Sequence, residues 1–260
     1  ISGGSGIFRR GLVSQQHQKV MQKLLGQTSS PAVAEQLWER RNELLKDGRF
    51  LGREQWVTIL FTDTCNFTTV SEQLTPSELM NWLNRGISIA VEAVNTRDGM
   101  VNKFTGDGML AVFGAPLSSG NNQDAKNALE AAQEIQIKFA ELNRELKKEK
   151  NHMMRLRVGI HSGVVLTGSL GNTQRLEYAV MGDTVNCASR LESYEKGRQN
   201  NLVRVLVSSV TRDFLVKDDK YLWENWGPLK VKGRSEELIV YELKDNKLED
   251  VQAICKTTDL

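Results

Sequence analysis

The stretch "VNKFTGDGMLAVFG", residues 101–114, decides the fold class. Two apolar runs flank a Gly-Asp-Gly turn centred on Asp107, and an Asp-Gly pair between apolar runs is a strong β-hairpin signal. The same hairpin carries a cation, Lys103, four residues before the anion Asp107. Strands in this position should bury apolar surface, so the charged pair requires a reason other than packing.

Strand and helix patterns alternate on both sides of this hairpin. A buried strand ending on Asp63 precedes it, followed by a helix that opens with the capping box "TPSE". The order β-α-β-β-α-β predicts an α+β domain with a ferredoxin-like core, in which helices cover one face of a mostly antiparallel sheet. The ranges behind this prediction are 56–63 (strand), 75–78 (capping box), 124–146 (helix), 156–168 and 201–209 (strands), and 228–243 (hairpin).

Composition restricts the class of protein. The chain has 260 residues, 40% of them hydrophobic, with a formal net charge of +2, which gives no support for a nucleic-acid surface. The three cysteines, Cys65, Cys187 and Cys255, lack metal-like spacing, so we expect reduced thiols in a cytoplasmic protein. No run is long enough to span a bilayer and no signal peptide is evident, although the full-length protein could be anchored upstream.

The chain divides into four predicted segments. Residues 1–6 read as a linker or a cloning remnant, and residues 7–52 as a helical connector that dimerises or relays a signal. Within the connector, Ser30 and Pro31 mark the start of a second helix. Residues 53–244 form the predicted main domain, and residues 245–260 form a tail.

The end of the first core strand is a candidate metal site. Asp63 is followed by a turn into a helix, where free backbone N–H groups can bind an anion while a carboxylate holds a cation. Asp107 lies at the hairpin tip between glycines that permit close approach of a ligand. If the two strands are neighbours, both carboxylates can reach a pair of ions about 3.5–4 Å apart. Each aspartate alone also has an ordinary structural explanation.

A second group of polar residues follows in "LEYAVMGDTVNCASRLES", residues 176–193. A helix beginning near Thr184 would place Asn186 and Arg190 on one face, as donors for a sugar oxygen and a phosphate. A solvated helix face is the alternative explanation. Lys232, beside Gly233, can point at phosphates or simply be solvated.

Five motifs together resemble class III nucleotidyl cyclase catalytic domains, over about residues 53–244. Each motif is weak alone, but the five occur in the family's order and approximate spacing. The N-terminal part resembles the helical connector of bacterial receptor cyclases. The motifs are "FTD…F" (61–67), "KFTGDG" (103–108), "RVGIHSG" (157–163), "GDTVNCASRLE" (182–192) and "VKGR" (231–234).

The resemblance implies a head-to-tail homodimer that converts a nucleoside triphosphate to a cyclic nucleotide with two divalent cations, Mg²⁺ or Mn²⁺. One protomer would supply the metal ligands, and its partner the groups that bind base, ribose and phosphate. Lys103 and Asp107 would then serve different active sites of one dimer, which explains the charged pair. The implied metal ligands are Asp63, the Thr64 carbonyl and Asp107; the nucleotide and phosphate contacts are Cys65, Asn66, Phe67, Thr68, Arg157 and Lys232; the catalytic pair is Asn186 and Arg190; and the base-specifying positions are Lys103 and Ala179.

The base-specifying positions favour ATP over GTP. Lys103 can donate to the unprotonated adenine N1 but offers no acceptor for guanine. The second position, Ala179, departs from the family pattern because alanine cannot accept from the adenine amino group. We therefore expect an adenylate cyclase acting in signal transduction. The alternatives are a guanylate cyclase, an inactive nucleotide-binding regulatory module, and a polymerase-like or diguanylate-forming enzyme.

Overall fold

The computed structural model describes residues 31–172, 176–215, 220–231 and 237–244. Two short helices and a two-stranded sheet precede the core sheet. The bounds are α2 (Pro31–Glu39), α3 (Arg41–Leu44), β1 (Leu45–Lys46), β2 (Arg49–Phe50), β3 (Arg53–Thr64), α4 (Phe67–Ser71), α5 (Pro76–Asn95), β4 (Met100–Phe104), β5 (Met109–Phe113), α6 (Asn121–Lys148), β6 (Leu156–Gly171), β7 (Leu176–Met181), α7 (Asp183–Ser193), η1 (Lys196–Arg198), β8 (Val203–Ser208), α8 (Ser209–Arg212), η2 (Asp213–Leu215), β9 (Leu222–Leu229) and β10 (Leu238–Lys244).

The central sheet confirms the predicted α+β class. Its strands lie in the order β4-β5-β3-β6-β8-β10-β9, and β7 pairs with β6 outside this path. The β6–β8 pair is parallel. The other recorded pairs of this sheet are antiparallel. The hairpin predicted over 101–114 is formed by β4 and β5, and the predicted first core strand is the middle of β3.

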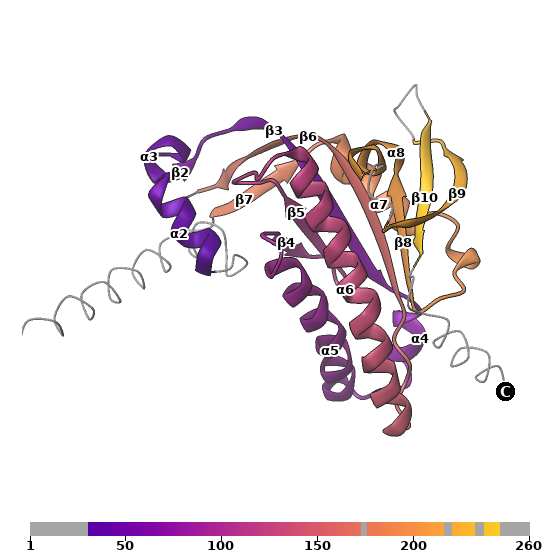
Figure 1. Ribbon diagram of the computed structural model, residues 1–260. Helices are drawn as coiled ribbons and strands as arrows, with labels where there is room; N and C mark the ends of the chain where they lie inside the picture. Colours follow the sequence, from indigo (N-terminus) through magenta and orange to yellow (C-terminus); the bar gives the residue numbers. More distant parts are fainter. Residues whose placement is uncertain (1–30, 173–175, 216–219, 232–236, 245–260) are drawn as a thin grey trace, which may run out of the picture.

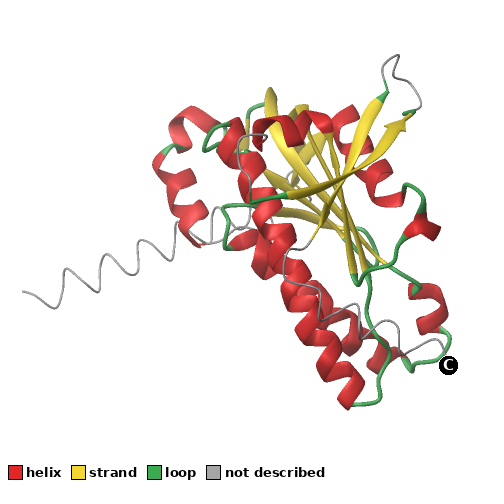
Figure 2. Cartoon of the chain, turned by 45° about the vertical axis from the view of Figure 1, so that its right-hand side comes forward, coloured by secondary structure: helices red, strands yellow, loops and turns green. Residues whose placement is uncertain are grey.

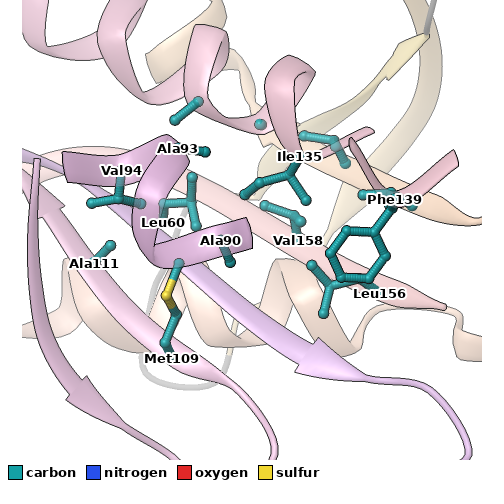
Figure 3. Close-up of a cluster of buried hydrophobic side chains, with 14 of the residues drawn as sticks. Leu60, Ala90, Ala93, Val94, Met109, Ala111, Ile135, Phe139, Leu156 and Val158 are labelled. Atoms are coloured by element: carbon teal, nitrogen blue, oxygen red, sulfur yellow. The ribbon is translucent and has the colours of Figure 1, made fainter. Parts of the chain in front are cut away.

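Helices α5 and α6 lie side by side across one face of the sheet (Figure 1). The capping box predicted at "TPSE" is present, because Thr75 and Glu78 bond each other's backbone at the start of α5. Alternate residues of β3, β5 and β6 point toward these helices and are fully or almost fully buried (Figure 3). The sheet-helix layer is therefore the main core, lined by Leu60, Ala90, Ala93, Val94, Met109, Ala111, Ile135, Phe139, Leu156 and Val158.

The opposite face of the sheet is also covered, so the expectation of helices on one face only is wrong. Helix α7 packs on β6 and β3, and buried side chains of the segment from α2 to β2 belong to the same hydrophobic cluster as Ala188 of α7. Figure 2 shows the sheet with helices around it. Phe50 meets Tyr178 of β7 edge to face, with 4.9 Å between ring centroids. The apolar side chains of α7 that face the sheet, such as Ala188, are buried because β3 and β6 carry core residues on both faces.

Several predicted features lie outside the described residues. They are the linker 1–6, the connector before Pro31, the tail 245–260, Cys255 and Lys232. Within the described part of the connector, helix α2 begins at Pro31 as predicted, but the β1–β2 pair was not expected. None of the helices in the described ranges has both the length and the apolar character that a bilayer crossing requires.

Candidate functional site

The two candidate metal carboxylates come from neighbouring strands. Asp63 lies one residue before the end of β3, and Asp107 lies in the turn that leads into β5. Strands β3 and β5 pair antiparallel with Thr62 opposite Met109. The adjacency on which the two-metal hypothesis depends is therefore present, since paired strands lie about 5 Å apart.

The hairpin tip is held tightly against β3. Thr64 Oγ1 donates to the carbonyl oxygen of Asp107 at 2.6 Å, and the Met109 N–H donates to Thr62 Oγ1 at 3.0 Å. Between these bonds, a Cβ added to Gly108 would lie 1.9 Å from the Thr62 carbonyl oxygen. Glycine at this position is what allows Asp107 to approach Asp63 so closely.

Two cationic side chains lie close to the negatively charged Asp63 carboxylate. Arg157 lies opposite Asp63 in the β3–β6 register, and its Nη2 donates to Asp63 Oδ2 at 2.5 Å. The Nζ atom of Lys196 lies 3.9 Å from the same oxygen. Burial and the negative charge of Asp63 together raise the pKa of Asp107 above its usual value. A divalent cation would relieve this crowding of negative charge.

A buried glutamate holds Arg157 from its other side. Glu192, near the C-terminal end of α7, is 4% exposed and accepts from Arg157 Nε at 2.9 Å. Burial raises the pKa of Glu192, while Arg157 opposes that shift. Burial disfavours the charge on Arg157, but the bonds to Asp63 and Glu192 outweigh it and raise the pKa of the guanidinium. Arg157 is therefore fixed between two carboxylates.

Sequence reasoning missed Glu192 and Lys196. The available signal was a charged residue at the buried face of α7, because Glu192 follows Ala188 by four residues and both are buried. A buried carboxylate on an apolar stripe requires a cation partner. Lys196 had no comparable signal, since it lies in a short polar segment after the helix.

The turn after β3 contains the residues predicted to contact nucleotide or phosphate. The Cys65 N–H donates to the Arg155 carbonyl at 2.8 Å, and Asn66 adopts a left-handed conformation with φ 57°. Phe67 and Thr68 begin α4. Burial raises the pKa of the Cys65 thiol, so this cysteine is a neutral part of the turn. All four residues follow Asp63 closely in the chain, in the turn after β3 and at the start of α4.

The two base-specifying positions lie on β4 and β7. The Nδ2 atom of Asn102 donates to the Tyr178 carbonyl oxygen at 2.7 Å, which brings together the residues preceding Lys103 and Ala179. Lys103 is exposed and Ala179 is buried. These two positions therefore follow residues that contact each other, and their role in base contact stays a prediction.

Asn186 and Arg190 lie on the exposed side of α7. The opposite side of the helix is pressed against β6, where a Cβ on Gly159 would lie 2.1 Å from the Ala188 carbonyl oxygen. Because Ala188 faces the sheet, Asn186 and Arg190 face away from it, at i and i+4 as predicted. The structure does not bring these two side chains onto the sheet surface where Asp63 and Arg157 meet.

The donor set suits a hard divalent cation. Asp63, Asp107 and the Thr64 carbonyl are all oxygen donors of the kind that Mg²⁺ and Mn²⁺ prefer. Among the described residues, no group of three or more His, Cys, Asp or Glu side chains could hold a metal. A metal here would therefore be completed by backbone and substrate oxygens, which is typical of Mg²⁺ sites that bind nucleotides.

Comparison with known proteins identifies the family of this chain. A family model described as the adenylate and guanylate cyclase catalytic domain matches residues 51–245. Adenylate cyclase 1 of Rhizobium meliloti (strain 1021) is 34% identical over 202 residues, which cover 76% of this chain. The chain spans 29% of that relative's length.

Solved structures are similar over the same part of the chain. The adenylyl cyclase CyaB from P. aeruginosa is 27% identical with a TM-score of 0.69, covering 76% of this chain and 98% of that chain. The guanylyl cyclase Cya2 is 28% identical with a TM-score of 0.66, covering 75% of this chain and 94% of that chain. Both have the fold described above, and they differ in the nucleotide named for each.

Proposed function

Because the chain belongs to the adenylate and guanylate cyclase catalytic-domain family, we propose that it converts ATP to 3′,5′-cyclic AMP and pyrophosphate in signal transduction. The observation that supports this proposal is that β3 and β5 are paired with Thr62 opposite Met109, so that Asp63 and Asp107 come from neighbouring strand ends, where burial and the charge of Asp63 raise the pKa of Asp107. The chain also contains the family's asparagine and arginine, Asn186 and Arg190, so it does not read as an inactive module.

Asp63, Asp107 and the Thr64 carbonyl would hold two divalent cations, Mg²⁺ or Mn²⁺. Bound there, the ions supply Lewis acidity that favours ionisation of the ribose 3′-hydroxyl and neutralises phosphate charge. Arg157 lies beside Asp63, and its guanidinium would contact the same phosphates. The turn at 65–68 offers backbone groups to them, and Lys232 is the proposed further phosphate ligand.

The reaction is an in-line displacement at the α-phosphorus. The 3′-oxygen forms a bond to the α-phosphorus while the bond to the pyrophosphate oxygen breaks, and the hydroxyl proton leaves to solvent. Asn186 would orient the ribose, and Arg190 would meet the negative charge that grows on the α-phosphate. A positioned arginine of this kind contributes factors of about 10³–10⁵ in rate in phosphoryl transfer.

We propose that each active site is shared by two copies of the chain, arranged head to tail. Asn186 and Arg190 face away from the sheet that carries Asp63, so a second copy is needed to bring them to the metal-bound nucleotide. An exposed apolar surface is available for that contact. It includes Phe104 on β4, Val164 and Leu166 on β6, and Met181 opposite Leu166 on β7.

The base contacts favour adenine. Lys103 donates a hydrogen bond and suits the adenine N1. Ala179 offers no side-chain acceptor, so recognition of the amino group would fall to a backbone carbonyl or water, and discrimination against GTP would be incomplete. Product analysis with ATP and GTP offered together tests this assignment, and a preference for GTP would make the protein a guanylate cyclase.

Complementation tests the shared site. Asp63→Ala removes a proposed metal ligand. Arg190→Ala removes the side chain proposed to stabilise the transition state. Each variant alone should therefore be inactive. Mixing equal amounts should restore about a quarter of wild-type activity, because half of the dimers are mixed and each has one complete site. Mixing Asp63→Ala with the Asp63→Ala/Arg190→Ala double variant is the control and should restore nothing. Recovery absent from folded, dimeric mixtures would refute the shared site.

A further inference from the structure

Lys196 lies beside the metal ligands but has no part in the site proposed above. Its Nζ atom is 3.9 Å from Asp63 Oδ2, the same oxygen that accepts the Arg157 Nη2 bond at 2.5 Å. The Arg157 side chain is 10% exposed and the Lys196 side chain is 53% exposed. Arg157 is therefore a buried cation bonded to Asp63, whereas Lys196 reaches Asp63 from the solvent side.

The turn that carries Lys196 is built to hold it there. The preceding residue, Glu195, has φ 40°, a left-handed conformation that non-glycine residues rarely adopt. Its carbonyl oxygen accepts from Nη1 of Arg204 at 2.9 Å, and the Glu192 carbonyl accepts from Nη2 of Arg204 at 2.7 Å. Arg204 is fully buried. A buried arginine thus fixes both the end of α7 and the direction in which the chain enters η1.

A second set of bonds joins this segment to the turn after β3. The Cys65 thiol donates to Gln199 Oε1 at 3.1 Å, and Gln199 Nε2 donates to the Leu156 carbonyl at 3.1 Å. The Arg155 Nη2 atom donates to the Gln199 carbonyl at 2.8 Å. Lys196 therefore extends from a backbone that is fixed relative to Asp63, and only its side chain is mobile.

Charge balance indicates what this side chain does when a metal arrives. With a divalent cation bound at Asp63, Lys196 would lose this carboxylate as its partner and its ammonium group would be repelled. Lysine has a long flexible stem and a compact charge, so it can turn to another anion nearby. The nearest new anion is a phosphate group bound to that same cation, and an ammonium–phosphate contact is a strong, charge-assisted hydrogen bond.

We propose that Lys196 is a phosphate-binding residue on the metal-donating protomer, which exchanges Asp63 for the β- and γ-phosphates of the nucleotide when metal binds. This rests on the proposed function, because it needs the metal and a polyphosphate at Asp63. Lys196 then has two opposite effects: it competes with metal for Asp63 before the nucleotide binds, and it strengthens polyphosphate binding afterwards.

Two binding measurements on the full chain separate these effects. The variants are Lys196→Gln, the conservative Lys196→Arg, and the control Lys148→Gln at the exposed end of α6. Mn²⁺ binding without nucleotide is followed by electron paramagnetic resonance. Binding of inorganic tripolyphosphate in saturating Mn²⁺ is followed by calorimetry, so neither readout depends on turnover.

For Lys196→Gln we expect Mn²⁺ to bind about 2- to 5-fold more tightly, as loss of a partly exposed ion pair predicts. Tripolyphosphate should bind about tenfold more weakly because one charged hydrogen bond is lost. Lys196→Arg should keep most of the tripolyphosphate affinity, and Lys148→Gln should match wild type in both assays.

Other results would overturn the proposal in distinguishable ways. If Lys196→Gln matches Lys148→Gln in both assays, Lys196 is only a solvated side chain. If both affinities fall, the lysine merely supports the local structure. If the wild-type protein itself does not bind tripolyphosphate with Mn²⁺, the proposed function fails, whereas normal wild-type binding with an unaffected variant refutes the role of Lys196 alone.

Discussion

Replacing Gly108 by alanine should separate the two proposed metal-binding carboxylates, Asp63 and Asp107. The added Cβ would lie 1.9 Å from the Thr62 carbonyl oxygen and 3.1 Å from the Asp63 Cα. Real Cβ atoms essentially never lie closer than 3.0 Å to another heavy atom, so the hairpin tip must retreat from β3 by about 1 Å or more. Both obstructing groups are backbone of a central strand and cannot rotate away.

The size of the expected effect follows from this displacement. A misplacement of about 1 Å can cost about 100-fold in rate, and forced overpacking costs about 1–3 kcal/mol in stability. We therefore expect Gly108→Ala to remain folded, to bind Mn²⁺ more weakly, and to form cyclic nucleotide about 100-fold more slowly. Urea unfolding, Mn²⁺ titration and initial rates measure the three quantities.

Gly106 supplies the matched control on the other side of Asp107. Its φ is 83°, and a Cβ there would meet nothing within 4 Å. Gly106→Asn therefore adds a side chain without a clash, in a conformation that asparagine tolerates. It should keep most of the metal affinity and activity. Equal activity in Gly108→Ala and wild type would refute the argument that this close approach sets the metal geometry.

Two further results are expected. Glu192→Gln keeps an acceptor for Arg157 but removes the buried charge, so the free energy of unfolding should fall by about 1–3 kcal/mol. Mn²⁺ should then bind more weakly, because Asp63 is the one anionic partner that Arg157 keeps. Urea unfolding measures the stability and Mn²⁺ titration measures the metal affinity. Unchanged metal affinity would contradict the reasoning. Burial raises the pKa of Asp124 above 3.8, so its stabilising contribution is complete below pH 3.8 and is lost as the pH rises through the raised pKa. Asp124→Asn should remove that part of the pH dependence of urea unfolding, and an identical pH profile in both proteins would exclude this carboxyl as its source.

Local sequence patterns were sufficient to predict most strands of the sheet. The apolar run ending at Asp63 and the Asp-Gly turn at Asp107 specify a strand and a hairpin through short-range preferences, and the structure contains both. Asn186 and Arg190 share a helix face because their spacing alone requires it. The likeness to class III cyclases is confirmed by the family match over residues 51–245.

The parts that sequence did not predict depend on contacts between distant segments. The pattern of α7 showed an amphipathic helix but not which sheet face it covers, because β3 and β6 carry buried residues on both faces. Glu192 meets Arg157 from 35 residues away, and Lys196 approaches Asp63 from the segment after α7. Spacing along the chain carries no signal for such pairs. The β1–β2 pair is two residues long on each strand, too short for an alternation pattern.

Helix α7 has a consequence for communication within a dimer. Within one turn it carries Glu192, which bonds Arg157 at the proposed metal end of one active site, and Arg190, whose exposed side chain we propose acts in the other. Because both residues lie on one helical turn, a shift of α7 that moves Glu192 also moves Arg190. In the proposed dimer, occupancy of one active site would therefore be transmitted through α7 to the other, and the two sites should not turn over independently.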